Sequence, residues 1–255
     1  MLRESDSYMK INELSNLFLE YKIYPNKLYS QNSPVKVFQN LYPDNYYAID
    51  ITEFLDLHRY EPIRRGADLP WWGKNYFDNN NTSSVMIISQ DSLSKDAGSV
   101  AFWANLYDVV HSQGEFTKYI SLLNDKKLFA YNSWERVLST IKDWNICIEN
   151  CYITDAAKVY KEGSSKDFDM AASKKLLVSE IELCKPDLIV LLGNPPLRLL
   201  MPEIQYSNII ENGEYLEYLG IKTVVSPFIT GMGLTQKNYK YRLELASKLI
   251  KDIII

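Results

Sequence analysis

Polar residues follow each of four short apolar runs in this chain of 255 residues, and they are the side chains best placed for chemistry. Ligands of open α/β sheets bind just beyond the carboxyl ends of the parallel strands. A carboxylate at such a strand end can orient or deprotonate a water molecule, and it can stabilise a cation electrostatically. The sequence therefore predicts a site at the strand ends, built from Ser89-Gln90-Asp91, Thr154-Asp155, Gly193-Asn194 and Ser226-Pro227-Phe228.

The elements that would position these residues are short strands alternating with helices. Strands are expected at residues 85–88, 151–154, 187–193 and 222–225. Helices are expected at 99–111, from about Ser133, at 168–184, after Asn194, and at 238–253. This alternation is typical of α/β domains with a mostly parallel sheet. We expect a three-layer α/β/α sandwich around a four-stranded sheet, occupying residues 81–255.

Residues 1–80 have a different character, because 15 of them are aromatic and lie among prolines and asparagines. One amphipathic helix is predicted at 11–21, with Leu14, Leu17 and Phe18 on one face. The rest has no clean helix or strand period. We expect an irregular extension packed on the core, which is also a candidate docking surface for a protein partner.

Composition excludes several classes of protein. Three cysteines and two histidines are too few for a disulfide framework or a thiolate metal cluster, and neither a Walker-type nor a dinucleotide-binding glycine motif occurs. No apolar run reaches the length of a membrane span, and the N-terminus lacks the apolar core of a signal peptide. We expect a cytoplasmic protein with no membrane partner, metal, iron–sulfur cluster or other cofactor.

Five segments in order resemble the uracil-DNA glycosylase superfamily. Residues 87–98 (IISQDSLSKDAG) have the layout of its first motif, with Gln90-Asp91 matching the Q-D of G-Q-D-P-Y-H. The other four segments are AGSVAFWA (97–104), YITDAAK (152–158), EIELCKPDLIVLLG (180–193) and VVSPFITGMG (224–233). The resemblance implies a protein of the α/β class that flips a base out of DNA and hydrolyses its N-glycosidic bond.

The resemblance also implies roles for individual residues. Asp91 would be the catalytic carboxylate, Phe102 would stack on the flipped base, and Asp155 would read the base edge. Ser226 stands at the position of the family's catalytic histidine, before the shared Pro227. Gln90 and Asn194 would contact the substrate, and the loop after the last strand would push an apolar wedge into DNA. The residues expected to contact DNA are Lys158, Pro227, Phe228, Ile229 and Met232.

Departures from the family pattern bear on the substrate. Ser89 replaces a glycine, Asp155 replaces the base-reading asparagine, and Ser226 replaces the histidine. An ionised carboxylate only accepts hydrogen bonds, so it suits a base that presents an amino group better than one that presents a carbonyl. We therefore expect action on an amino-bearing or modified base, in single- or double-stranded DNA, rather than on plain uracil.

Each candidate residue also has a structural interpretation. Asp91 could cap a turn, Phe102 could pack in the core, and Asp155 could pair with Lys158. The basic residues of 222–251 (Lys222, Lys237, Lys240, Arg242, Lys248 and Lys251) could follow phosphates or form a solvated face. Two other functions stay open: a catalytically degenerate module that binds nucleic acid or protein, and an enzyme acting on free nucleosides or nucleotides.

Overall fold

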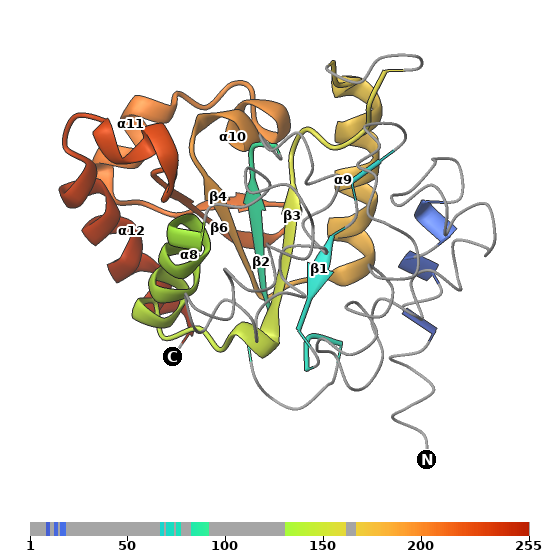
Figure 1. Cartoon of the computed structure of the whole chain (residues 1–255), viewed down its shortest axis with the longest axis horizontal. Coiled ribbons are helices and arrows are strands. Elements are labelled where there is room, and N and C mark those ends of the chain that lie inside the picture. Colours follow the sequence, from blue (N-terminus) through green and yellow to red (C-terminus); the bar gives the residue numbers. More distant parts are fainter. Residues whose placement is uncertain are drawn as a thin grey trace.

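The computed structural model describes residues 9–10, 13–14, 16–18, 67–68, 70–73, 75–77, 83–91, 131–161 and 167–254. The helix expected at 99–111 and the base-stacking candidate Phe102 lie outside the described residues. The α/β class predicted from the sequence is confirmed by the elements that follow (Figure 1).

A single six-stranded sheet forms the centre of the described structure. Its strands lie in the order β1-β3-β2-β4-β6-β5. Strands β3, β2, β4 and β6 are parallel, whereas β1 pairs antiparallel with β3 and β5 pairs antiparallel with β6. The bounds are β1 (Trp71–Trp72), β2 (Val85–Ser89), β3 (Cys151–Asp155), β4 (Leu188–Leu192), β5 (Leu216–Tyr218) and β6 (Ile221–Ser226).

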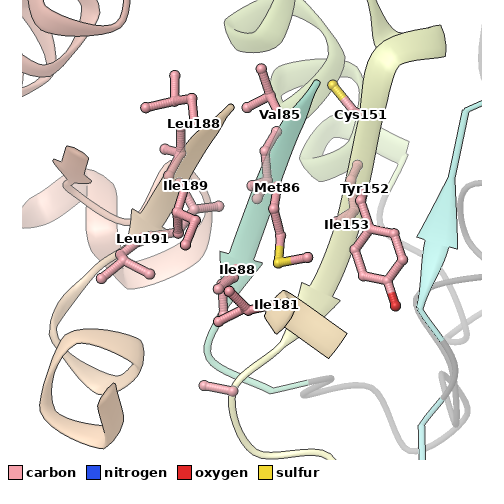
Figure 2. Close-up of a cluster of buried hydrophobic side chains, with 14 of the residues drawn as sticks. Val85, Met86, Ile88, Cys151, Tyr152, Ile153, Ile181, Leu188, Ile189 and Leu191 are labelled. Carbon is pink, nitrogen blue, oxygen red and sulfur yellow. The ribbon is translucent and has the colours of Figure 1, made fainter. Parts of the chain in front are cut away.

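The four parallel strands coincide with the four expected apolar runs, but the expected strand number was wrong because β1 and β5 add antiparallel edges. All five residues of β4 are buried, as expected for a parallel strand that is covered on both faces. The adjoining strands contribute Val85, Met86, Cys151 and Tyr152 to the same core (Figure 2). Continuous apolar runs therefore identified the interior strands and left the short edge strands unmarked.

Five α-helices connect and cover these strands in the described part of the chain. They are α8 (Tyr131–Asp143), α9 (Met170–Cys184), α10 (Asn194–Leu200), α11 (Tyr206–Asn212) and α12 (Tyr239–Ile254). Short 3-10 turns occupy Ile148–Asn150 and Gly231–Thr235. Figure 1 shows α8 and α12 to one side of β2 and β3, and α9 to the other side.

The helix predictions agree with the structure to within a few residues, although α8 begins at Tyr131 rather than at the expected cap Ser133. The Asp169 side chain caps α9 by accepting a hydrogen bond from the Ala172 amide (2.9 Å). The helix ends at Cys184 and is capped by Lys185, whose φ of 46° lies in the left-handed region. Pro186 follows, so the helix cannot continue.

The described part of the N-terminal region is continuous with the core. Leu14 and Phe18 are fully buried, as their helical spacing predicted. Trp72 of β1 stacks on Tyr152 of β3, with ring centroids 6.1 Å apart. Gly73, which follows Trp72, allows the chain to pass close to the backbone of Glu149, because a Cβ there would lie 2.1 Å from the Glu149 carbonyl oxygen. The region thus contributes a strand to the sheet, which the expected irregular extension did not include.

Candidate active site at the carboxyl ends of the parallel strands

The order of the parallel strands locates a switch point, where a ligand crevice is expected. Counted along the chain, the parallel strands β2, β3, β4 and β6 are the first, second, third and fourth. Across the sheet their order is second, first, third, fourth. The chain moves outward in one direction from β2 to β3 and in the opposite direction from β4 to β6. Ligands of doubly wound sheets bind beyond the carboxyl ends at such a switch point, here between β2 and β4.

Asp155 is the most unusual side chain at this edge. Its residue is 2% exposed, and Ser89, its register partner on β2, donates a hydrogen bond from Oγ to Asp155 Oδ1. The other oxygen, Oδ2, is buried and has no hydrogen-bond partner among the described residues. A buried carboxyl oxygen without a partner is costly, so this oxygen is a candidate position for binding a ligand group.

Burial also changes the acidity of this carboxyl. The pKa of Asp155 is raised from 3.8 to about 6, chiefly by desolvation, and the negative charges of Asp91 and Glu180 act in the same direction. The Ser89 hydrogen bond and the positive charge of Lys158 act in the opposite direction. Asp155 therefore changes between a hydrogen-bond donor and a pure acceptor close to neutral pH.

Asp91 lies directly beyond β2 in a partly exposed position. The Gln90 side-chain amide donates to Asp91 Oδ2 (3.1 Å), while Oδ1 is buried without a hydrogen-bond partner in the described structure. The two loops are joined by the amides of Ala156 and Ala157, which donate to the carbonyls of Ser89 and Gln90 (2.9 and 2.8 Å). The backbone thus fixes the Asp91 and Asp155 loops together.

Two carboxyl groups in different environments are the usual basis for dividing acid and base roles. Asp155 is buried and held by Ser89, whereas Asp91 is partly exposed and held by Gln90. Asp91 is thus a candidate for orienting water, and Asp155 is a candidate for meeting the polar edge of a ligand. The structure brings together the predicted residues Gln90, Asp91 and Asp155.

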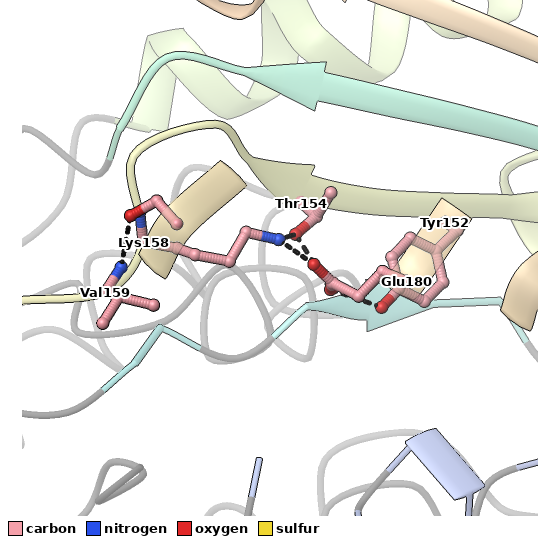
Figure 3. A network of polar contacts seen from close by, with 6 residues as sticks. Tyr152, Thr154, Lys158, Val159 and Glu180 are labelled. Atoms are coloured by element: carbon pink, nitrogen blue, oxygen red, sulfur yellow. Dashed lines mark hydrogen bonds and ion pairs between the residues drawn. The ribbon is translucent and has the colours of Figure 1, made fainter. Parts of the chain in front are cut away.

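The expectation that Lys158 binds DNA was wrong. This side chain is fully buried, and its ammonium donates to Glu180 and to Thr154 Oγ1 (Figure 3). Glu180 also accepts hydrogen bonds from the Tyr152 hydroxyl (2.7 Å) and from Thr154 (3.3 Å). Lys158 therefore cannot contact a phosphate, nor does it pair with Asp155.

Glu180 was missed by the sequence analysis, although its position carried a signal. It lies on the buried stripe of α9, between Leu176 and Cys184 at i−4 and i+4. A carboxylate on an otherwise apolar helix stripe requires a buried partner. That partner is Lys158, which lies 22 residues earlier in the chain.

The end of β4 supplies two of the expected site residues. Gly193 has φ of 83° and donates its amide to the Ser226 carbonyl (2.8 Å), which joins the ends of β4 and β6. Asn194 begins α10 and is partly exposed. Asn194 therefore stays a candidate ligand contact at the crevice.

The end of β6 differs from the expectation of a catalytic serine and an apolar wedge. Ser226 is fully buried, and its hydroxyl donates to the Pro227 carbonyl (3.1 Å). Pro227 is buried as well, and Ile229 is 1% exposed. These residues serve the core, so the expectation that Ser226, Pro227 and Ile229 meet a substrate or DNA was wrong.

Phe228 is the remaining described candidate in this loop, since the Met232 side chain lies outside the described residues. Phe228 is partly exposed, and its Cβ would lie 3.5 Å from a Cβ at position 193. Gly233 permits this loop conformation, because a Cβ there would lie 2.0 Å from the Phe228 carbonyl oxygen. Phe228 therefore sits over the end of β4, beside the crevice.

The basic residues of 222–251 do not form one face directed at the crevice. Lys237 and Lys240 are exposed near the start of α12, which follows the carboxyl end of β6. Lys222 lies near the start of β6, at the amino edge of the parallel strands. Lys248 lies about two helical turns beyond Lys240 on α12, which runs back toward the amino edge. Arg242 is paired with Glu211 at 2.5 Å. Two exposed lysines, Lys237 and Lys240, therefore follow the carboxyl end of β6.

Comparisons with known proteins assign no family to this chain. No protein-family model matches it, and no curated protein matches it either. Within the described residues, no three His, Cys, Asp or Glu side chains are grouped so that they could hold a metal ion. None of the helices in the described part of the chain is long and apolar enough to cross a membrane.

Proposed function

We propose that this protein is a glycosylase-like hydrolase, a three-layer α/β/α domain that takes a base out of DNA and cleaves its N-glycosidic bond. The observation that carries the proposal is the pair of Asp91 and Asp155 at the carboxyl ends of β2 and β3, next to the switch point. One carboxyl is partly exposed, and the other is buried with Oδ2 unpartnered among the described residues. This pairing matches what base release requires: stabilisation of a sugar cation, activation of water, and recognition of the base edge.

Asp91 is assigned the catalytic role. Its carboxylate stabilises the positive charge that develops on the sugar as the base leaves, and it orients the attacking water. Gln90 holds one Asp91 oxygen at 3.1 Å, which leaves the other oxygen to interact with the reacting groups. No cofactor is required, because water is the only other reactant.

Asp155 is assigned the reading of the base. Above its pKa of about 6 the carboxylate accepts a hydrogen bond, so it binds a base through an amino group. Below that pH the protonated carboxyl can donate to a base carbonyl while its other oxygen accepts from Ser89. At pH 7 and above, the ionised form favours an amino-bearing or modified base over plain uracil.

The test uses full-length protein and single-stranded and duplex oligonucleotides that carry cytosine, a modified pyrimidine or uracil. Abasic sites are scored by alkaline strand cleavage. The proposal predicts abasic sites at an amino-bearing or modified base. Salt-dependent DNA binding without any abasic site indicates a binding module instead, since phosphate contacts weaken with salt. Cleavage of free nucleosides without any cleavage of DNA indicates an enzyme that acts on free nucleosides or nucleotides.

A further inference from the structure

The proposed function gives no role to the buried ion pair of Lys158 and Glu180. Lys158 lies three residues after Asp155, and Glu180 lies on α9. Both side chains have 0% exposure, and each makes more than one hydrogen bond. A buried pair is a weak source of net stability, because desolvating two charges offsets their attraction. Its placement therefore invites a functional explanation.

The contacts of Lys158 and its neighbours tie one loop to three elements. Its ammonium reaches back to Thr154 on β3 and across to Glu180 on α9 (Figure 3). Its backbone amide and that of Val159 donate to Ser173 Oγ on α9 (3.2 and 2.9 Å). Ala156 and Ala157 bind the end of β2 on the other side. Asp155 begins this clamped segment.

We propose that Lys158 is a positioning residue: through Glu180 it anchors the loop after β3 to α9, and so it holds the Asp155 carboxyl against Ser89 in its ligand-binding position. The proposal rests on the proposed function for the use of Asp155, but not for the clamp itself. Lys158 also acts on Asp155 through its positive charge. The other charged groups acting on Asp155 are Asp91 beyond β2 and Glu180 on α9.

The test is a carboxyl titration by NMR of full-length protein with 13C-labelled aspartate. Asp155 is assigned as the signal lost in Asp155→Asn. In Lys158→Met, we expect the midpoint for Asp155 to rise by about one pH unit, because a nearby positive charge has been removed. The Ala156 and Ala157 amides should also exchange with solvent faster, because the loop has lost its anchor.

A second variant allows for failure to fold, since Lys158→Met leaves Glu180 buried and unpaired. Lys158→Met/Glu180→Leu replaces the pair with apolar groups. In it the Asp155 midpoint should rise less, because Glu180 no longer raises the pKa, while the amide protection is still lost. Arg242→Met breaks the surface pair with Glu211 and is the control, which should change neither signal.

An unchanged Asp155 midpoint together with unchanged amide exchange, in a folded Lys158 variant, would overturn the proposal. These readouts need no substrate, so they judge the clamp even where wild-type protein releases no base. Where base release is observed, the acid limb of the pH–rate profile should shift to higher pH, together with the Asp155 midpoint. If the Asp155 midpoint shifts but the acid limb stays at the same pH, the state of Asp155 does not control the reaction. That result would contradict the positioning role of Lys158.

Discussion

The ends of β3 and β6 lie at the same edge of the sheet, and both carry residues expected to act on a substrate, yet they differ in how their polar atoms are satisfied. At the end of β3, Asp155 is buried with one oxygen unpartnered in the described structure. At the end of β6, the Ser226 hydroxyl donates to the neighbouring Pro227 carbonyl. One strand end thus retains unused binding capacity, and the other does not.

Under the proposed function, this difference favours chemistry at the ends of β2 and β3 rather than beyond β6. A hydroxyl that is satisfied by its own backbone contributes to local structure, and a buried carboxyl with a free oxygen is retained at a cost in stability. Ile229, in the loop after β6, also contributes to structure, since its side chain is buried in the core. The predictions below test whether the two ends differ in function as they do in structure.

The largest expected effect separates Asp91 from Ser226. Asp91→Asn should lower the single-turnover rate of base release by about 10²- to 10⁴-fold, the usual contribution of a positioned acid or base. Ser226→Ala should change it less than about threefold, because no catalytic group is removed. Thermal unfolding of both variants provides the control for folding. Activity that persists in Asp91→Asn shows that Asp91 is not the catalytic carboxylate.

The second prediction concerns stability. Folded Asp155 has a pKa of about 6 against 3.8 for the free side chain, so folded protein binds more protons between these values. The unfolding free energy therefore falls as the pH rises through this range. Asp155→Asn cannot ionise, so it should not lose unfolding free energy as the pH rises. It should therefore be more stable than wild-type protein by up to ~3 kcal/mol at pH 8, with no gain at pH 3.5.

Urea unfolding at both pH values measures this effect, with the exposed Asp252→Asn on α12 as the matched control. A gain that is equal at the two pH values would show that ionisation of Asp155 does not destabilise the fold. The result would then remove the contrast between the two strand ends.

The third prediction concerns substrate preference and pH. Lowering the pH from 8 to 5 protonates Asp155 and gives it a donor for a base carbonyl. The ratio of uracil release to cytosine release should rise about tenfold or more, since one edge contact discriminates by ~1–3 kcal/mol. Competition between two labelled oligonucleotides measures the ratio. A ratio independent of pH contradicts the assignment of Asp155 as the reading group.

The smallest expected effect concerns the lysines. Lys240→Gln near the carboxyl edge should lower the slope of log Kd against log salt by about 1, as expected for one lost phosphate contact. Lys248→Gln, farther along α12, should leave the slope unchanged. Fluorescence anisotropy from 50 to 300 mM salt gives both slopes. Equal changes in the two variants indicate a diffuse charge effect rather than a contact at this edge.

The interior of the fold could be predicted from the sequence because its signals are local. Continuous apolar runs identified β2, β3, β4 and β6, and the Lys185-Pro186 pair marked the end of α9. Strand β1 has two residues, and β5 has a charged Glu217 between two apolar residues, so neither has a recognisable period. Their pairing depends on distant parts of the chain.

The site was only partly predictable for the same reason. Asp91 and Asp155 follow buried strands, and the rule for strand ends identified them. The pairing of Lys158 with Glu180 joins residues 22 positions apart, so the lysine was taken for a surface group. An apolar residue in a loop, such as Ile229, has the same sequence signal whether it faces solvent or the core.

The most direct measurement of the central claim, that Asp155 reads a flipped base for cleavage, compares wild-type protein with Asp155→Ala at pH 8. Both are incubated with oligonucleotides carrying uracil, cytosine or a modified pyrimidine, and abasic sites are counted. We expect wild-type protein to release an amino-bearing or modified base in preference to uracil, and Asp155→Ala to lose this release. Robust uracil release that survives Asp155→Ala would contradict the account.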